Sequence, residues 1–320
     1  MNLGISVFLE SYKKVIVAFI LIVLLFALGG LIVPNFLTVE QVLFTLKLAS
    51  FTALFALCQM VVIAAGGGGL DLSVGYAATL TAVLTASVMD GQNANLGTAI
   101  LIALALGSAI GLANGALASF LNLPPLVVTM AMANILQGIV NAYTAGRNIT
   151  GRPSPILAII AAKSTGSFPN ILFILLAITV LVMIVLNKTK WGTILFGVGS
   201  NETTAYLSGI NVKVVRCIAF VVSGVLASLT GLLLIGNMGI AFKDMASNYV
   251  MPSIAAVVVG GVSLTGGDGN YIGVILGAIF LQALTNLLIA FGLGDAGKWL
   301  VFGIVLYALL SFYASNRRSR

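Results

Sequence analysis

The sequence predicts an all-α fold, a polytopic membrane bundle of about ten transmembrane helices, some of them broken. Of its 320 residues, 60% are hydrophobic and only 7% are charged, whereas charged residues make up about 25% of a typical soluble domain. The mean hydropathy is +1.16, and apolar runs of about 20 residues, the length that crosses a bilayer core, recur along the chain. We therefore expect residues 1–320 to form a single transmembrane domain.

The predicted spans follow one another with mostly short connections. The first comes after Lys13 and Lys14. Because no clean small-residue cleavage site follows it, we interpret it as an uncleaved span rather than a signal peptide. The third and eighth spans are the weakest, since they are rich in Ser, Thr or Gly. The spans are expected at residues 15–33, 42–65, 71–89, 97–121, 124–144, 170–187, 214–238, 249–264, 269–291 and 296–313.

The distribution of positive charge predicts the orientation. With the N-terminus inside and ten alternating spans, nine Lys and Arg residues fall inside and six fall outside. This bias has the sign that the positive-inside rule requires. It places both termini and the long 188–213 connection in the cytoplasm, and the other long connection, 145–169, outside. Eight spans would also leave both termini inside.

Composition excludes several classes of chemistry. The chain has no histidine, which rules out histidine-based triads and HExxH zinc sites. Cys58 and Cys217 both lie in apolar runs and are expected to be small buried residues rather than a disulfide. No P-loop motif occurs, and no two of the eight acidic residues are close enough in sequence to form a metal-binding pair. We therefore expect a transport protein rather than an enzyme, with no metal or cofactor bound to this chain.

Small residues recur at helical spacing in two predicted spans. Gly107, Gly111 and Gly115 are four residues apart, and so are Gly273 and Gly277. Small residues at this spacing let helix backbones approach closely in lipid. The alternative is that such spacings arise by chance among 36 glycines. The pattern favours helix-packing faces.

The first of three unusual segments follows the second span. Four consecutive glycines, 66–69, are expected to end the helix, and Asp71 precedes the next apolar run. An acid here can accept hydrogen bonds from the free N–H groups at a helix start. Alternatively, Asp71 lines a translocation path, since ionisable groups are costly inside membranes. Either way, non-helical backbone at membrane depth is tolerated only against protein or a wet cavity. The residues of this broken-helix motif are Gly68, Gly69, Asp71 and Ser73.

The second unusual segment repeats part of the first. Residues 260–267 align with residues 68–75, with glycines at both ends of each stretch. Broken helices in corresponding halves of a transporter often mark its centre. Eight residues do not establish a repeat, so the relation is a hypothesis. The residues of this second broken-helix motif are Gly260, Gly261, Ser263, Gly266 and Gly267.

The third unusual segment, residues 199–212, predicts a short helix within the cytoplasmic 188–213 loop. Asn201 can cap its start, Glu202 suits its first turn and Gly209 suits its end. Its apolar residues have nothing in this chain obliged to cover them, so the helix is either a surface turn or a docking helix for a partner that supplies energy. The candidate coupling residues are Asn201, Glu202, Ala205, Tyr206, Leu207, Ser208, Gly209 and Ile210.

These segments resemble the permease subunits of bacterial ABC importers for monosaccharides, of the ribose, galactose, arabinose and autoinducer type. The family patterns GGIDLSVG, PPFIxTLGM, GxNxxAAxxSGI and AAVVLGGxSLxGGxG are matched in this order from residues 68, 124, 199 and 255. The similarity runs from about residue 35 to the C-terminus. Departures include Leu70 for isoleucine, Met130 and Ala131 for Leu-Gly, and Thr204 for alanine, and they affect the substrate more than the family.

The resemblance also implies the other subunits of the transporter. Two permease copies, or this chain with a sister permease, would form the pathway in the bacterial inner membrane. A cytoplasmic ATPase, which would bind ATP and Mg²⁺, would dock at the 188–213 loop. A periplasmic or lipid-anchored sugar-binding protein would deliver the substrate to the outer face.

Amide side chains are the candidates for contact with the sugar. Asn134, Gln137 and Asn141 lie on one face of the fifth span. Amides donate and accept hydrogen bonds without a charge, which suits a neutral sugar. Gln282 and Asn286 form a second pair in the ninth span. For both sets the alternative is hydrogen bonding between neighbouring helices.

Two alternative functions remain open from the sequence. One is a self-sufficient secondary transporter or channel, against which the lack of acids near span centres, apart from Asp71, is an argument. The other keeps the ABC importer but replaces the sugar with a nucleoside or another polyhydroxylated solute.

Overall fold

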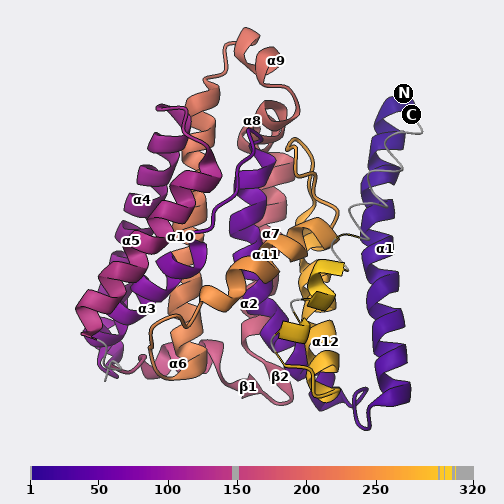
Figure 1. The fold of residues 1–320 in the computed structure, drawn as a ribbon, viewed down its shortest axis with the longest axis vertical. Coiled ribbons are helices and arrows are strands. Elements are labelled where there is room, and N and C mark those ends of the chain that lie inside the picture. The colour runs from indigo at the N-terminus through magenta and orange to yellow at the C-terminus, as the bar shows by residue number, and fades with distance from the viewer. Residues whose placement is uncertain (1, 146–150, 295, 299, 305–306, 308–320) are drawn as a thin grey trace.

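The computed structural model describes residues 2–145, 151–294, 296–298, 300–304 and 307 (Figure 1). Within them the regular secondary structure is helical, apart from one small hairpin. In chain order the elements are α1 (Asn2–Ile32), α2 (Val39–Ala64), α3 (Val74–Met89), η1 (Asn93–Asn95), α4 (Leu96–Ser119), α5 (Pro125–Thr144), α6 (Pro155–Ala161), β1 (Ser164–Thr165), β2 (Phe168–Pro169), α7 (Ile171–Lys188), α8 (Lys190–Ser200), α9 (Glu202–Leu207), α10 (Val212–Met238), η2 (Ser247–Tyr249), α11 (Val250–Val259) and α12 (Tyr271–Ala290).

Seven of the described helices are long and apolar enough to cross a membrane: α1, α2, α4, α5, α7, α10 and α12. The third and eighth predicted spans correspond to the shorter helices α3 and α11, which agrees with their weak signal. The tenth predicted span, 296–313, lies mostly outside the described residues. The all-α membrane fold is confirmed, whereas the count of ten and the orientation of the termini stay predictions.

Several predicted boundaries were wrong. Helix α3 begins at Val74 rather than at residue 71, and α11 ends at Val259 rather than at 264. The early end of α11 has a local cause, because Gly261 adopts a left-handed conformation (φ 81°) that continues no right-handed helix. The connection 145–169 contains α6 and the antiparallel hairpin β1–β2. The connection 188–213 contains α8 in addition to the predicted short helix.

Helices α2 and α10 form the centre of the bundle. In α2, 83% of the membrane-spanning window is buried, compared with 22% for α1 and 17% for α7. Both hydrophobic cores of the described chain include residues of α2 and α10. One core joins them to α8, α11 and α12, and the other joins them to α3 and α4.

The predicted glycine faces are packing faces. A Cβ added to Gly107 or Gly111 would overlap the backbone of α10 near Gly224 and Phe220. Gly277 meets the backbone of α11 in the same way. The glycines therefore let α4 pack directly on α10, and α12 on α11, as small residues do in membrane helices.

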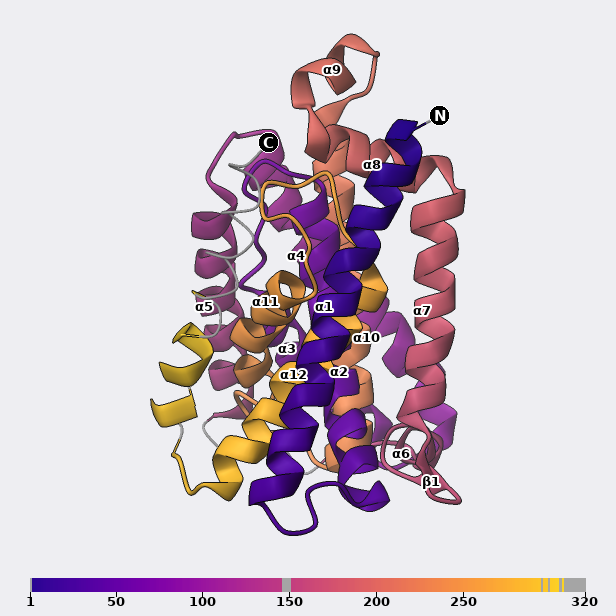
Figure 2. The ribbon, with the colours of Figure 1, turned by 90° about the vertical axis from the view of Figure 1, so that its right-hand side faces the viewer.

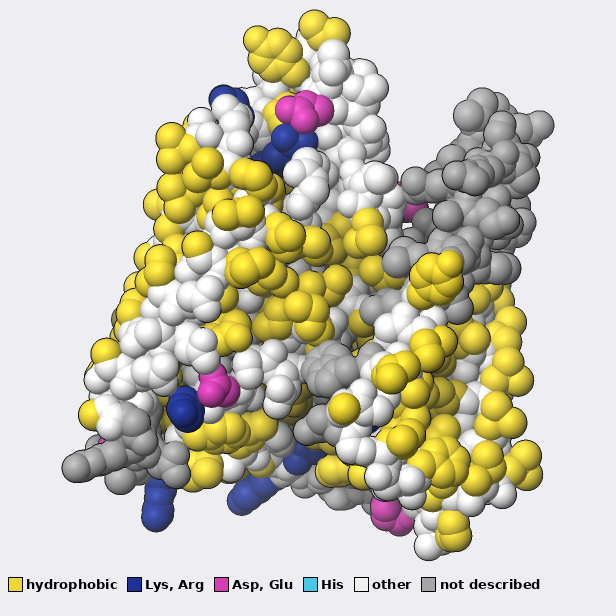
Figure 3. All heavy atoms as spheres, viewed as in Figure 1, with side chains coloured by type: hydrophobic (Ala, Val, Ile, Leu, Met, Phe, Trp, Pro, Cys, Tyr) yellow, Lys and Arg dark blue, Asp and Glu magenta, His cyan; other side chains and the backbone are white. Residues whose placement is uncertain are grey.

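The outer helices present apolar side chains outward. Exposed residues of α1 and α7 include Phe19, Leu24, Phe173 and Leu181. Figure 3 shows a surface on which hydrophobic side chains predominate along the height of the bundle, with most of the charged groups near its two ends. This belt is suited to contact with lipid.

The two ends of the bundle differ. Helices α8 and α9 lie at the same end as the start of α1, and α9 stands above the rest of the bundle (Figures 1 and 2). The hairpin β1–β2 and α6 lie at the opposite end. The predicted orientation requires the N-terminus and the 188–213 loop to share a side, and this arrangement is compatible with it.

Candidate transport pathway and coupling site

The break between α2 and α3 encloses a buried carboxylate. Asp71 is 1% exposed. Its Oδ1 accepts hydrogen bonds from the Ser73 backbone N–H (3.0 Å) and from Ser73 Oγ (2.6 Å), and its Oδ2 accepts one from Ser223 Oγ of α10 (2.9 Å). Ser73, rather than Asp71, occupies the N-cap position of α3. Asp71 thus binds the backbone just before the helix and also ties it to α10.

Further polar side chains hold the same segment on other sides. Gln59 of α2 bonds both the N–H and the carbonyl of Asp71, at 3.2 and 2.7 Å. Asn114 of α4 donates to Ser73 Oγ (2.9 Å), and Thr129 of α5 donates to the Leu70 carbonyl (3.1 Å). Four helices therefore supply partners for the irregular backbone, as a break inside a membrane protein requires.

The second broken segment, between α11 and α12, has a different backbone. Gly68 has φ 70°, whereas Gly260, its aligned counterpart, has φ −69° and ends α11. Gly75 lies within α3, whereas its counterpart Gly267 has φ 77°. The two segments are both helix breaks, but the position-by-position correspondence proposed from the sequence was wrong. A shared glycine pattern permits several turn conformations and selects none of them.

The predicted short helix is present as α9. Asn201 Oδ1 accepts from the Thr204 N–H (2.9 Å), as an N-cap does, and Gly209 has φ 81° just beyond the helix end. Tyr206 and Leu207 are 71% and 80% exposed. Ala205 is buried, and Ile210 packs against one of the hydrophobic cores. The helix therefore covers part of its apolar surface and leaves two large side chains uncovered.

The end of α8 meets both broken segments at one point. A Cβ on Gly199 would overlap the Ala64 carbonyl oxygen at the end of α2 and the Gly267 backbone nitrogen. The Gly267 N–H donates to the Ala64 carbonyl (3.1 Å), and Ser200 Oγ donates to the Gly267 carbonyl (3.2 Å). We call Ala64, Gly199, Ser200 and Gly267 the junction. Only Asn201 separates the junction from the start of α9, so α9 is directly connected to the contacts with both helix breaks.

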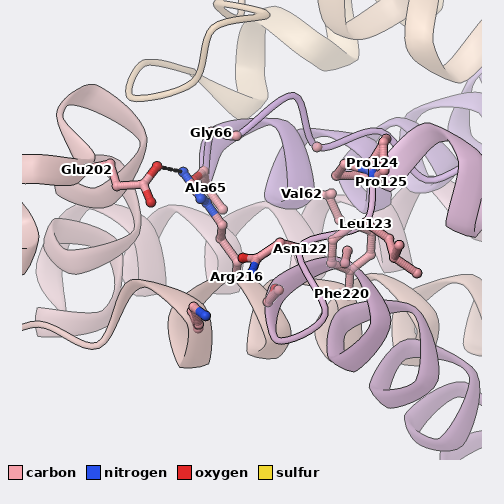
Figure 4. A pocket seen from close by; sticks show the side chains of 15 residues that line it. Val62, Ala65, Gly66, Asn122, Leu123, Pro124, Pro125, Glu202, Arg216 and Phe220 are labelled. Carbon is pink, nitrogen blue, oxygen red and sulfur yellow. Dashed lines mark hydrogen bonds and ion pairs between the residues drawn. The ribbon is translucent and has the colours of Figure 1, made fainter.

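An ion pair joins α9 to α10 beside the junction. Arg216 Nη2 lies 2.8 Å from Glu202 Oε2, and Arg216 Nε donates to the Ala65 carbonyl at 3.3 Å. Figure 4 shows Glu202 and Arg216 facing each other across one side of a cavity, with Ala65 next to the guanidinium. The cavity has a volume of about 300 Å³ and is also lined by the α4–α5 connection around Pro124.

The candidate amides of α5 lie on an open face of the chain. Asn134 and Asn141 are exposed, and Gln137 is half-buried. Asn134 donates to the Met130 carbonyl of its own helix (3.1 Å), whereas Gln137 Nε2 donates to Asp244 Oδ1 (3.0 Å). The structure thus brings an acid into this set that was not predicted from the sequence.

The second amide pair joins two helices. Gln282 Nε2 donates to Asn286 Oδ1 (3.1 Å), and Asn286 Nδ2 donates to Thr45 Oγ1 of α2 (2.8 Å). These contacts favour the helix-packing alternative for this pair over contact with substrate.

Sequence reasoning missed three parts of the site: helix α8 with Gly199 and Ser200, the cation Arg216, and Asp244. For α8 a signal existed in the sequence, since Gly192, Leu195 and Val198, the residues that are buried, recur at every third position as on one face of a helix. The sequence holds no comparable signal for Arg216 or Asp244. Arg216 is 14 residues from its partner Glu202, and Asp244 is 107 residues from its partner Gln137.

A polytopic helical bundle with two broken helices, a polar face and an exposed short helix at one end defines a membrane transport permease. A family model described as branched-chain amino acid transport system / permease component matches residues 41–310. The chain belongs to this permease family.

The chain is also similar to curated proteins across nearly its whole length. It is 30% identical to the ribose import permease protein RbsC of Escherichia coli K12, over 93% of this chain and 92% of that protein. It is 32% identical to RbsC of Haemophilus influenzae (85% and 84%) and 29% identical to the autoinducer 2 import system permease protein LsrC of Shigella flexneri (95% and 88%). The resemblance seen in the motifs is thereby confirmed. No solved structure matches.

Proposed function

We propose that this chain is the transmembrane permease subunit of an ATP-driven ABC importer for a monosaccharide or a related polyhydroxylated solute. It works in the bacterial inner membrane with its termini and the 188–213 loop in the cytoplasm. A separate ATPase hydrolyses ATP, and a sugar-binding protein delivers the cargo to the outer face. The similarity to ribose and autoinducer 2 import permeases supports this cargo class.

The observation that carries the proposal is the connection of α9 to both broken helices. The exposed Tyr206 and Leu207 offer an apolar contact at the tip of the bundle. The junction and the Glu202–Arg216 pair lead from this contact to the backbone at the end of α2 and to Gly267 in the connection between α11 and α12. A partner that moves α9 therefore also moves the two helix breaks. The backbone at Gly199 is packed so closely against Ala64 and Gly267 that α9 has no free space in which to move independently of them.

The open face of α5 supports a second permease copy. Asn134 and Asn141 are exposed on a helix of the membrane bundle, and polar side chains inside membranes face protein or a water-filled cavity rather than lipid. A second copy of this chain, or a sister permease, placed against this face encloses a polar path between them. The amides then face a neutral cargo.

The proposal is tested by Leu207→Glu in the permease co-expressed with its ATPase. Leu207 is 80% exposed, so its replacement leaves the fold of this chain intact, but it removes the apolar contact. We expect the ATPase to be lost from the purified complex. Leu207→Met is the matched control, because it keeps an apolar side chain at the same exposed position. Equal recovery of ATPase with both variants would contradict the docking assignment.

A further inference from the structure

Residues 239–249, which join α10 to α11, place an acidic side chain at membrane depth beside α5. Gln137, the partner of Asp244, lies seven residues before the end of α5, about 10 Å along the helix axis. The Ala246 N–H donates to Thr79 Oγ1 (3.2 Å), and Thr79 lies ten residues, about 15 Å, before the end of α3. Asp244 therefore lies within the height of the bundle rather than in an outer loop.

Asp71 and Asp244, two carboxylates that lie within the height of the bundle among the described residues, differ in how far their oxygens are hydrogen-bonded. Asp71 is 1% exposed, and three donors bind its two oxygens. Asp244 is partly exposed, and Gln137 donates to Oδ1, while Oδ2 has no donor among the described residues. A carboxylate whose purpose is to hold irregular backbone is expected to look like Asp71. Asp244 instead keeps hydrogen-bonding capacity open to the exterior of the chain.

Asp244 also does not cap its own segment. The Ser247 N–H and Oγ donate to the Asp244 backbone carbonyl, while the carboxylate reaches across to α5. The backbone at Asp244 is left-handed (φ 64°), a conformation that is uncommon outside glycine but that aspartate and asparagine adopt more readily than other residues. The carboxylate is thus directed to α5, to the helix face that also carries Asn134.

We propose that the Asp244 carboxylate, positioned by Gln137, is a hydroxyl-accepting site for the polyhydroxylated cargo on the transport path. A carboxylate oxygen accepts short, strong hydrogen bonds from hydroxyl groups, and Asn134 and Asn141 lie about one turn to either side of Gln137 on the same face of α5. Ionisable groups within membrane bundles face water-filled paths and mark substrate sites. This inference rests on the proposed function, because that path forms only when a partner permease covers the face.

The first test is the accessibility of the position. Asp244→Cys is labelled with a membrane-impermeant, negatively charged methanethiosulfonate in proteoliposomes that hold the assembled transporter. The native Cys58 and Cys217 are buried and serve as the background. We expect labelling of Cys at 244 and none of Leu181→Cys, which lies 60% exposed on the apolar surface of α7. An unreactive thiol at 244 would overturn the proposal.

The second test is transport. Asp244→Asn is expected to lower the amount of sugar imported per ATP hydrolysed by about tenfold, the effect of losing one charge-assisted hydrogen bond. Asp90→Asn is the matched control, because Asp90 is an exposed acid that is also left-handed (φ 39°), and asparagine tolerates this conformation. The probes are radiolabelled ribose and a panel of neutral pentoses and hexoses.

The outcomes separate the two proposals. If the wild-type complex imports one of these sugars and Asp244→Asn imports it equally well per ATP, the Asp244 site is overturned and the proposed function stands. If the wild-type complex imports none of them, the proposed function fails and the cargo site fails with it. A defect in Asp244→Asn, with normal import by Asp90→Asn, supports the site.

Discussion

Exchange of the charges of Glu202 and Arg216 is the sharpest perturbation of the coupling route. Their side chains lie 2.8 Å apart and are 58% and 21% exposed, so the pair itself contributes roughly 0.2–1 kcal/mol. Glu202→Arg replaces attraction with repulsion of similar size, so the change is twice as large, about 0.4–2 kcal/mol, and its midpoint of about 1.2 kcal/mol corresponds to roughly sevenfold in an equilibrium. Arg216→Glu adds the loss of the hydrogen bond to the Ala65 carbonyl, worth about 1 kcal/mol.

The double variant Glu202→Arg with Arg216→Glu distinguishes a coupling route from a general defect. It restores the ion pair but not the bond to Ala65, because glutamate has no donor. We expect the amount of sugar imported per ATP to fall about fivefold to tenfold in Glu202→Arg and to recover to within about fivefold of wild type in the double variant. The assay is import and ATP hydrolysis measured on the same proteoliposomes. Wild-type coupling in both single variants, or a double variant worse than Arg216→Glu, would refute the reasoning.

Three further predictions concern the junction, the buried carboxylate and the α5 face. Gly199→Ala should lower thermal stability and import, because its Cβ overlaps backbone atoms, whereas Gly197→Ala in the same helix has open space and should be neutral in a melting assay. Ser223→Ala leaves a buried carboxylate oxygen without its donor and should destabilise the protein by about 1–3 kcal/mol in denaturant unfolding, while an unchanged midpoint would count against the network. Asn134→Ala with Gln137→Ala should reduce import several-fold while the complex still purifies intact; unchanged kinetics would assign these amides to packing.

Local structure could be predicted from the sequence where it depends on local chemistry. Asn201 and Gly209 bracket α9 because capping and a left-handed end are properties of neighbouring residues. The glycine stripe of α4 was recognised as a packing face for the same reason, but its partner α10 was not.

Contacts between residues that are distant in the sequence could not be predicted from it. Nothing in the sequence indicated that Gly199 lies against Ala64 and Gly267, or that Gln137 meets Asp244, since such pairs are set by how whole helices pack. The same limit explains the error with the two broken segments. Their glycines match in position, yet the turns differ because different neighbours surround them.

The central claim is that ATP hydrolysed by a partner drives sugar across this chain. It is tested most directly by reconstituting the permease in proteoliposomes with and without its ATPase and binding protein, and following uptake of a neutral sugar. The account predicts uptake that requires both partners and ATP and is indifferent to proton and sodium gradients. Uptake by the permease alone, driven by an ion gradient, would contradict it.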